Sequence, residues 1–300
     1  MTEVVQVGAE AADDVVAVIH GAFAGRPVLD PPSTALDETS ESVAATLAAH
    51  GGLLATHDGE PVGALLFADH GTLLGLRRVG VLASARHHGV ARKLADAAAA
   101  VAAERRKDGL DLEAREELPQ TIAFWHKHGY VEVERDGPRL RMLRLLPLRL
   151  TLQTAEDTRA VGEQLGPVLG AGDLVILTGD LGAGKTTLTQ GLGDGLGVRG
   201  PVTSPTFVIA RVHPSLRGGP ELVHVDAYRL GDAAELDDLD LDTDLDEAVT
   251  VVEWGSGLAE ALSTDRLELR LERADDDVRT LTLTPVGARW LGAGLRDALA

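Results

Sequence analysis

The chain has 300 residues, contains no cysteine and carries a formal net charge of -19 at pH 7. The lack of cysteine excludes disulfides, thiolate catalysis and thiolate-ligated metal centres. The acidic balance argues against a protein that grips nucleic acid through its own surface, because such binding needs clustered lysine and arginine. No run of about 18 apolar residues occurs, and the N-terminus lacks the basic start of a signal peptide, so we expect a cytoplasmic protein outside the membrane.

The length favours two domains, and two series of helix and strand patterns meet near Leu146-Pro147-Leu148-Arg149. An apolar and basic strand at 139–146 ends the first series, and a strand at 149–152 begins the second. Thr154, followed by Asp157, predicts the start of the next helix. We therefore expect two α/β domains, residues 1–148 and residues 149–300. The first holds 21 acidic and 15 basic residues, net -6, and the second 26 and 13, net -13.

In the first half, strands at 53–56 and 62–67 with a turn at 57–60 predict a hairpin, and a further strand ends near 81–82. The segment Arg86-His87-His88-Gly89-Val90-Ala91 then opens an alanine-rich helix at 92–106. An R/Q-x-x-G-x-G/A turn at the start of a helix offers backbone N–H groups to a pyrophosphate. A strand at 110–114 and a closing helix and turn at 123–130 follow.

Together these elements resemble GNAT-type acetyltransferases, over about residues 3–146. The resemblance implies a mixed α/β sheet and acetyl-CoA as cofactor. It implies acetyl-CoA contacts from Val81, Arg86, His87, His88, Gly89, Val90 and Ala91.

The first half departs from that family where the chemistry occurs. Trp125 stands where the family often has the tyrosine that protonates the departing thiolate, and Leu118 stands where it has an asparagine. The strand at 73–81 carries no Glu or Asp to accept the proton of the amine. The remaining acid–base candidates are His70, His87, His88 and Tyr130. Two interpretations stay open: an N-acetyltransferase of unknown acceptor, and a CoA-binding or purely structural appendage.

The second half contains a complete GxxxxGKT phosphate loop, Gly179 to Thr186, between the apolar run 174–177 and a helix expected to open at Thr187. Glycines let such a loop turn tightly and direct N–H groups at phosphate oxygens, and the helix adds the positive end of its dipole. Lys185 supplies a compact charge to the outer phosphates, and the Thr186 hydroxyl is a Mg²⁺ ligand. Lys185 is the single lysine among thirteen basic residues of this half, which fits a site that requires a point charge.

Two later strands each end in a carboxylate, at Asp226 and at Glu253. Because parallel strands end at one edge of a sheet, we expect both acids beside the phosphate loop, facing Mg²⁺ and the attacking water; their individual roles stay open. Trp254 is expected either in the core or stacked on the nucleotide base. The hydroxyl-rich segment 202–207 is placed to sense the terminal phosphate, unless it is an ordinary proline turn.

The loop, Ser204-Pro205-Thr206-Phe207, His224-x-Asp226-x-Tyr228-Arg229-Leu230 and Val252-Glu253-Trp254 resemble, in order and spacing, the TsaE family over residues 150–285. The resemblance implies a P-loop ATPase with a largely parallel sheet, needed for threonylcarbamoyl modification of the tRNA adenosine next to the anticodon. It implies TsaB and TsaD as partners, and contact with tRNA only through them. It implies a catalytic role for Lys185, Asp226 and Glu253, and Thr186 and Glu253 as Mg²⁺ ligands. It implies ATP contacts from Asp180, Leu181, Gly182, Ala183, Gly184, Lys185, Thr186, Thr187 and Trp254.

Other interpretations of the second half remain. A small-molecule kinase would use the same loop, with Arg211 and Arg229 as its few basic candidates. A scaffold would use the nucleotide to control docking and carry an inactive N-terminal half. The acidic segment 232–247 contains Asp240, Asp242 and Asp244 at calcium-loop spacing, but Leu245 and Val251 stand where an EF-hand needs glycine and glutamate, which favours a solvated acidic surface.

Overall fold

The structure is a computed structural model, and it describes every residue except 28, 231–245, 275–277 and 300. Contacts divide the chain into two units, Met1–Leu146 and Pro147–Ala300. The sequence placed the boundary two residues later, but Leu148 already begins a strand that pairs within the second unit. The aspartates of the calcium interpretation lie outside the described residues.

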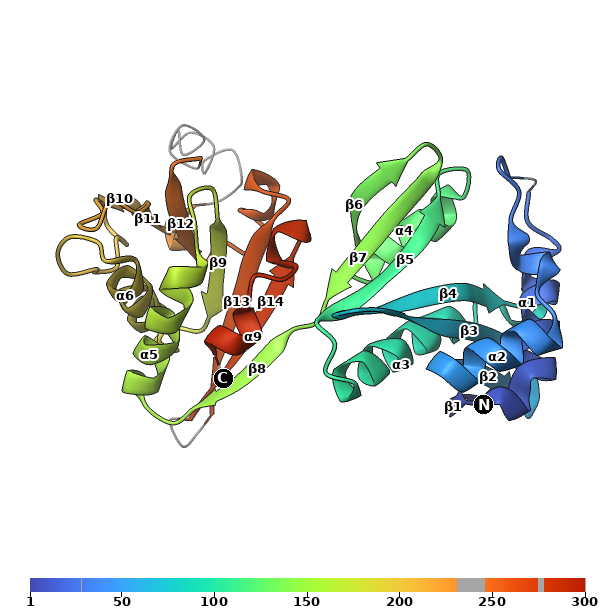
Figure 1. The fold of residues 1–300 in the computed structure, drawn as a ribbon. Coiled ribbons are helices and arrows are strands. Elements are labelled where there is room, and N and C mark those ends of the chain that lie inside the picture. The colour runs from blue at the N-terminus through green and yellow to red at the C-terminus, as the bar shows by residue number, and fades with distance from the viewer. Residues whose placement is uncertain (28, 231–245, 275–277, 300) are drawn as a thin grey trace. The chain divides into compact units, whose positions relative to one another are not determined.

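The described part of the N-terminal unit is built on a seven-stranded sheet (Figure 1). Its neighbouring strands are antiparallel except for the pair β4–β5, which is parallel. In order across the sheet the strands are β1 (Thr2–Val7), β2 (Gly52–His57), β3 (Glu60–His70), β4 (Leu73–Val81), β5 (Gly109–Arg115), β7 (Arg139–Leu145) and β6 (Val131–Asp136). The predicted hairpin is therefore confirmed, as β2 and β3.

Alternation along β2 and β3 divides this unit into two cores, one on each face of the sheet. Leu53 and Phe67 pack with α3 (Val90–Glu104) and with Trp125 of α4 (Pro119–Lys127). Leu54 and Leu66 pack with α1 (Ala12–Phe23) and α2 (Ser40–His50). Helix α3 begins two residues before the predicted position, directly after Gly89 at φ +73.

Strands β4 and β5 pair only over their first four residues, from Leu73–Gly109 to Leu76–Leu112. Immediately beyond that point β4 bulges against β3, and Arg78 takes a left-handed backbone at φ +53. A non-glycine residue in that region is strained and tends to mark a functional site. Strands β4 and β5 diverge beyond the bulge. The gap between them leads from one face of the sheet to the other.

The described part of the C-terminal unit also has a seven-stranded sheet, but its ladder is mixed. The central strands β11, β12, β9 and β13 are parallel, as expected, whereas β10, β14 and β8 pair antiparallel at the edges, which the sequence did not predict. In order the strands are β10 (Ala210–His213), β11 (Glu221–Asp226), β12 (Ala248–Glu253), β9 (Leu174–Gly179), β13 (Arg266–Arg273), β14 (Arg279–Val286) and β8 (Leu148–Leu152).

Helices α5 (Ala155–Leu165) and α6 (Lys185–Leu196) pack against each other in this unit, and a short α9 (Leu295–Ala298) lies near its end. The helices approach so closely that a Cβ on Gly191 would strike the carbonyl of Arg159. The glycines of α6 therefore permit the contact that holds the phosphate loop's helix in place. No described helix combines the length and the apolar character needed to cross a membrane.

Thr154→Ala is expected to destabilise the C-terminal unit by about 1 kcal/mol, because Thr154 and Asp157 form a reciprocal capping box at α5. Hydrogen exchange resolved by peptide measures each unit separately. The matched control is Thr39→Ala, which removes the capping box of α2 and should weaken protection only in the N-terminal unit. Unchanged protection of α5 in the Thr154 variant would contradict the role of the cap.

Candidate functional sites

The phosphate loop connects the end of β9 to α6. Gly179 has φ +146, and a Cβ there would collide with the Leu271 carbonyl of β13. Gly184, at φ +108, is the N-cap of α6, which starts at Lys185 rather than at the predicted Thr187. The first N–H groups of a helix have no intrahelical partner, so this start offers donors to an anion.

Lys185 is buried, with Nζ turned back onto its own loop. It donates to the carbonyls of Gly179 at 2.8 Å and Asp180 at 3.0 Å, and it lies 3.9 Å from the ring centroid of Trp254. Burial lowers the pKa of Lys185, while the charges of Glu253, Asp226 and Asp180 act in the opposite direction. The lysine and the tryptophan that the sequence singled out are thus in contact.

Glu253 is buried at the end of β12, and its two oxygens face different groups. Oε1 lies 3.0 Å from Nε2 of His224 and accepts from Thr189 at 3.4 Å, whereas Oε2 accepts from the Thr186 hydroxyl at 3.4 Å. The two residues expected to ligate Mg²⁺ are therefore adjacent. One carboxylate oxygen is fixed by neighbours, and the other points at the loop hydroxyl.

Asp226 lies next to Glu253 in the parallel register of β11 and β12. Its Oδ2 accepts from the hydroxyls of Ser204 at 3.0 Å and Thr206 at 2.5 Å, and its Oδ1 accepts from the N–H of Tyr228 at 3.1 Å. The hydroxyl-rich segment is thus tied to Asp226. A change at this carboxylate would be transmitted to the segment.

Two contributors to this site were missed by the sequence analysis. His224 is fully buried against Glu253; the signal was its position two residues before Asp226, on the same face of the strand. Arg279 donates from Nε to the carbonyl of Ala183 in the loop at 3.0 Å. No local pattern marks Arg279, because it comes from β14, far along the chain.

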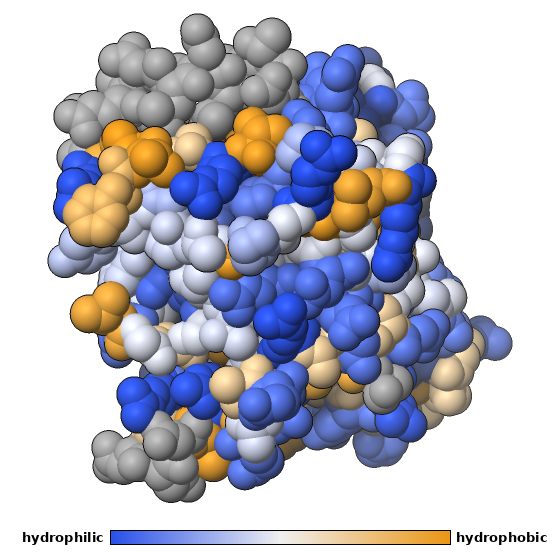
Figure 2. Space-filling view, turned by 90° about the vertical axis from the view of Figure 1, so that its left-hand side faces the viewer, coloured by the Kyte–Doolittle hydropathy of each residue, from blue (hydrophilic) through white to orange (hydrophobic). Residues whose placement is uncertain are grey.

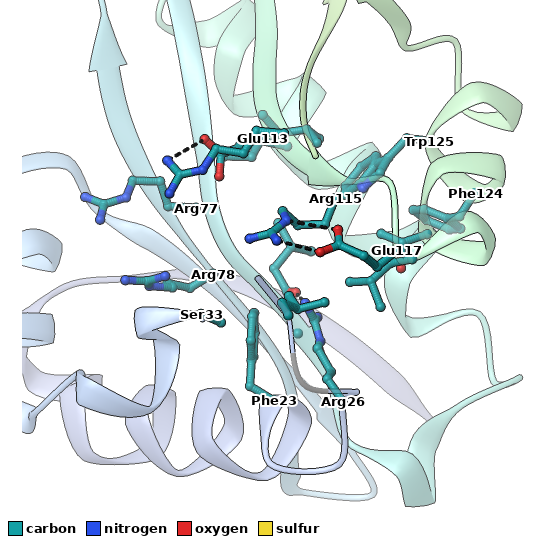
Figure 3. A pocket seen from close by; sticks show the side chains of 18 of the residues that line it. Phe23, Arg26, Ser33, Arg77, Arg78, Glu113, Arg115, Glu117, Phe124 and Trp125 are labelled. Atoms are coloured by element: carbon teal, nitrogen blue, oxygen red, sulfur yellow. Dashed lines mark hydrogen bonds and ion pairs between the residues drawn. The ribbon is translucent and has the colours of Figure 1, made fainter. Parts of the chain in front are cut away.

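The N-terminal unit contains a pocket of about 1180 Å³ at the opening between β4 and β5. Figure 3 shows Phe23 and Arg26 on one side of it, Glu113 on the other, and the Arg115–Glu117 ion pair between them. Among the predicted acetyl-CoA residues, Val81, Arg86 and Ala91 line this pocket. An adjoining cavity of about 260 Å³ is lined by the same three and by His87, Gly89 and Val90. His88 lines neither cavity, and its ring lies 5.2 Å from that of His57.

The acid–base candidates of this unit lie in different places, and not all of them line the pocket. His70 lines the pocket, with Nδ1 2.8 Å from Asp111. Tyr130 is instead buried in the core, its ring 4.9 Å from that of Trp125, and burial raises the pKa of its hydroxyl. Glu113 and Glu117 also line the pocket; the sequence did not single them out, because they lie on and just after β5, whereas the carboxylate was expected on β4.

Known protein families match both units of the chain. The family "Threonylcarbamoyl adenosine biosynthesis protein TsaE" matches residues 152–281. The TsaE protein of Streptomyces coelicolor is 63% identical over 140 residues, which are 45% of this chain and 95% of that protein. The chain belongs to the TsaE family. The TsaE protein of Bacillus subtilis is 41% identical over 136 residues, covering 45% of this chain and 84% of that protein.

The Acetyltransferase (GNAT) family matches residues 22–130, so the chain joins a GNAT domain to a TsaE domain. Among solved structures, Bacillus subtilis YdiB is 34% identical, covers 51% of this chain and 94% of its own, and has a TM-score of 0.42. The PaiA N-acetyltransferase of Thermoplasma acidophilum, in complex with coenzyme A, is 14% identical, covers 49% and 99%, and has a TM-score of 0.44. The TsaE match includes every residue of the nucleotide site described above.

Proposed function

We propose that the TsaE domain hydrolyses ATP. The observation that carries this proposal is the convergence of Lys185, Thr186 and Glu253 at one edge of the sheet. The loop N–H groups bind the phosphates, Lys185 leaves its loop carbonyls to neutralise the outer phosphates, and Asp226 orients the attacking water. Trp254 lies beside the lysine and packs against the nucleotide.

The donor set at this site fits Mg²⁺. Thr186 and Glu253 present a hydroxyl and a carboxylate oxygen, and this hard cation is usually held by one or two such ligands together with phosphate oxygens and waters. In the described residues there is no cluster of three or more His, Cys, Asp or Glu suited to a metal ion. The protein would therefore hold the ion together with ATP, where it neutralises phosphate charge.

We further propose that ATP turnover serves threonylcarbamoyl modification of tRNA, with TsaB-like and TsaD-like partners and with tRNA reached only through them. The names of the relatives and the net charge of -13 over residues 149–300 support this arrangement. Phe207, Val208, Leu216 and Tyr228 are exposed apolar side chains in this unit. Figure 2 views the side that carries β10, where apolar side chains lie in small groups among hydrophilic ones.

Hydrolysis of ATP by the full chain, measured with and without purified TsaB-like and TsaD-like proteins, tests this role. We expect the partners to change the rate and free phosphate to be released. Formation of a phosphorylated small molecule would instead identify a kinase. A rate independent of both partners would contradict the proposed assembly.

For the GNAT domain we propose acetyl-CoA-dependent N-acetylation, with the pyrophosphate at the turn before α3. The exposed Arg86, the left-handed Gly89 and the open first turn of α3 suit a pyrophosphate. Glu113 lines the pocket and is the candidate to accept the proton of the amine.

Calorimetry of the full chain with acetyl-CoA is expected to show one site, weakened about tenfold by Arg86→Gln, since a charged hydrogen bond contributes roughly 1.5–3 kcal/mol. Arg135→Gln is the matched control, because Arg135 pairs with Glu132 and Glu116 and does not line the pocket. Absence of binding would favour the scaffold interpretation.

A further inference from the structure

The pocket of the GNAT domain is unusually rich in charge, and most of that charge is internally neutralised. Pairs form within and beside it between Arg78 and Glu38, Arg115 and Glu117, Arg139 and Glu113, and Arg141 and Asp111. Each pair joins one positive and one negative side chain, so the paired residues together contribute little net charge to the pocket. The groups that stay unpaired therefore decide which charges a bound molecule should carry.

Arg26 is the partly buried cation of this pocket that lacks a carboxylate partner among the described residues. Its guanidinium lies 3.6 Å from the ring centroid of Phe23 and donates a hydrogen bond, at 3.1 Å, to the carbonyl of Val79. Burial, and next the charge of Arg86, lower the pKa of Arg26 to about 10. A guanidinium has five N–H donors, and only one hydrogen bond to a described protein acceptor occupies those of Arg26. A desolvated cation of this kind favours an anionic ligand.

The opposite wall carries one carboxylate without a cationic partner among the residues that the structure describes. Glu113 of β5 pairs with Arg139, and Glu134 of β6 pairs with Arg141, whereas no described residue forms an ion pair or hydrogen bond with the carboxylate of Asp136, which also lines the pocket. Figure 3 shows Glu113 across the pocket from Arg26. In the described part of the chain, the cavity therefore has an unpaired cation beside α1, where an anion can bind, and an unpaired carboxylate beside β6, where an amine can bind.

Arg26 and the cofactor turn belong to elements on different faces of the sheet, although the charge of Arg86 still acts on Arg26. Arg26 follows α1, which covers one face of the sheet, whereas the turn at 86–91 leads into α3 on the other face. The pocket reaches both through the opening between β4 and β5. Arg86 supplies positive charge at the turn itself, and Arg26 supplies a second positive group on the α1 side of the same pocket.

We propose that the acceptor of the GNAT domain is a small primary amine that also carries a carboxylate or phosphate, with Arg26 binding that anion. This inference rests on the proposed acetyl transfer. The bound ammonium first loses one proton to water, which leaves a neutral amine. The amine nitrogen then forms a bond to the acetyl carbon, the carbon–sulfur bond of the thioester breaks, a second proton passes from the nitrogen to a pocket carboxylate such as Glu113, and CoA leaves as the thiolate. The acidic wall holds the amine end, and Arg26 holds the far end.

The test uses matched amines with the full chain. 4-Aminobutyrate and 5-aminopentanoate are each compared with their carboxamides, and 2-aminoethyl phosphate with ethanolamine, by the release of CoA thiol. We expect the anionic member of at least one pair to have a kcat/KM about tenfold higher or more, as one charged hydrogen bond allows. Arg26→Gln should abolish this preference through KM for the amine, Arg26→Lys should restore part of it, and the control Arg135→Gln should retain it.

Equilibrium binding makes the inference independent of turnover. In the presence of CoA, calorimetry should show the N-acetylated anionic amines binding about tenfold tighter than their amides in the wild type, and equally in Arg26→Gln. Equal affinities in the wild type would overturn the inference. So would an Arg26 variant with a raised KM for acetyl-CoA and an unchanged amine preference, because Arg26 would then serve a CoA phosphate. Preferential binding without any turnover would reject the acetyltransferase proposal and still support the anion site.

Discussion

Lys185→Ala is expected to lower kcat/KM for ATP hydrolysis by about 10²–10³-fold, the cost of removing one electrostatic contact to the charge of the reacting phosphates. Lys185 is buried between the loop carbonyls and Trp254 and is the lysine of the phosphate loop. Steady-state phosphate release measures the effect. Hydrolysis at the wild-type rate would remove the basis of the nucleotide-site assignment.

Lys185→Arg sharpens that experiment, because it retains the charge and changes the shape. A planar guanidinium does not fit where a compact ammonium lies 2.8 Å and 3.0 Å from two loop carbonyls. We therefore expect a loss nearly as large as that of the alanine variant. The control is Arg199→Ala, an exposed basic residue of the same unit outside the loop, which should keep normal hydrolysis.

Glu253→Gln and Asp226→Asn are expected to fail in different ways. Glu253 faces the Thr186 hydroxyl, so its variant should require a higher Mg²⁺ concentration for half-maximal hydrolysis. Asp226 is occupied by Ser204, Thr206 and the N–H of Tyr228, so its variant should lower kcat without moving the Mg²⁺ midpoint. Titration of the rate with Mg²⁺ separates the two roles that the sequence left open.

Glu260→Gln is the matched control for both carboxylates, since Glu260 accepts a hydrogen bond from the N–H of Gly257 and lies away from the loop. His224→Gln extends the comparison. His224 positions Glu253 through its Nε2, and a glutamine amide can donate in its place. The His224→Gln variant should therefore shift the Mg²⁺ concentration for half-maximal hydrolysis less than Glu253→Gln does. Identical midpoints in the Glu253 and Asp226 variants would contradict this division of labour.

Local patterns determined much of this protein. The glycine spacing of the phosphate loop, the capping residues at Thr154 and the apolar strands ending in Asp226 and Glu253 are short-range signals, because each reflects backbone geometry within one element. The parallel pairing of β11 and β12 followed from them and is confirmed. The resemblance to two families likewise came from motifs within single segments.

Tertiary structure decided what no segment contains. Arg279 reaches the loop from β14, and the antiparallel edges of the sheet depend on which strands meet across long separations. Tyr130, a candidate acid in the sequence, is in the core, while Arg26 and Glu113 face one another across a pocket that exists only because β4 and β5 diverge. The sequence determines the chemistry of each side chain, but burial and proximity depend on how distant segments pack. Burial and proximity in turn decide which charged groups remain free to bind a ligand.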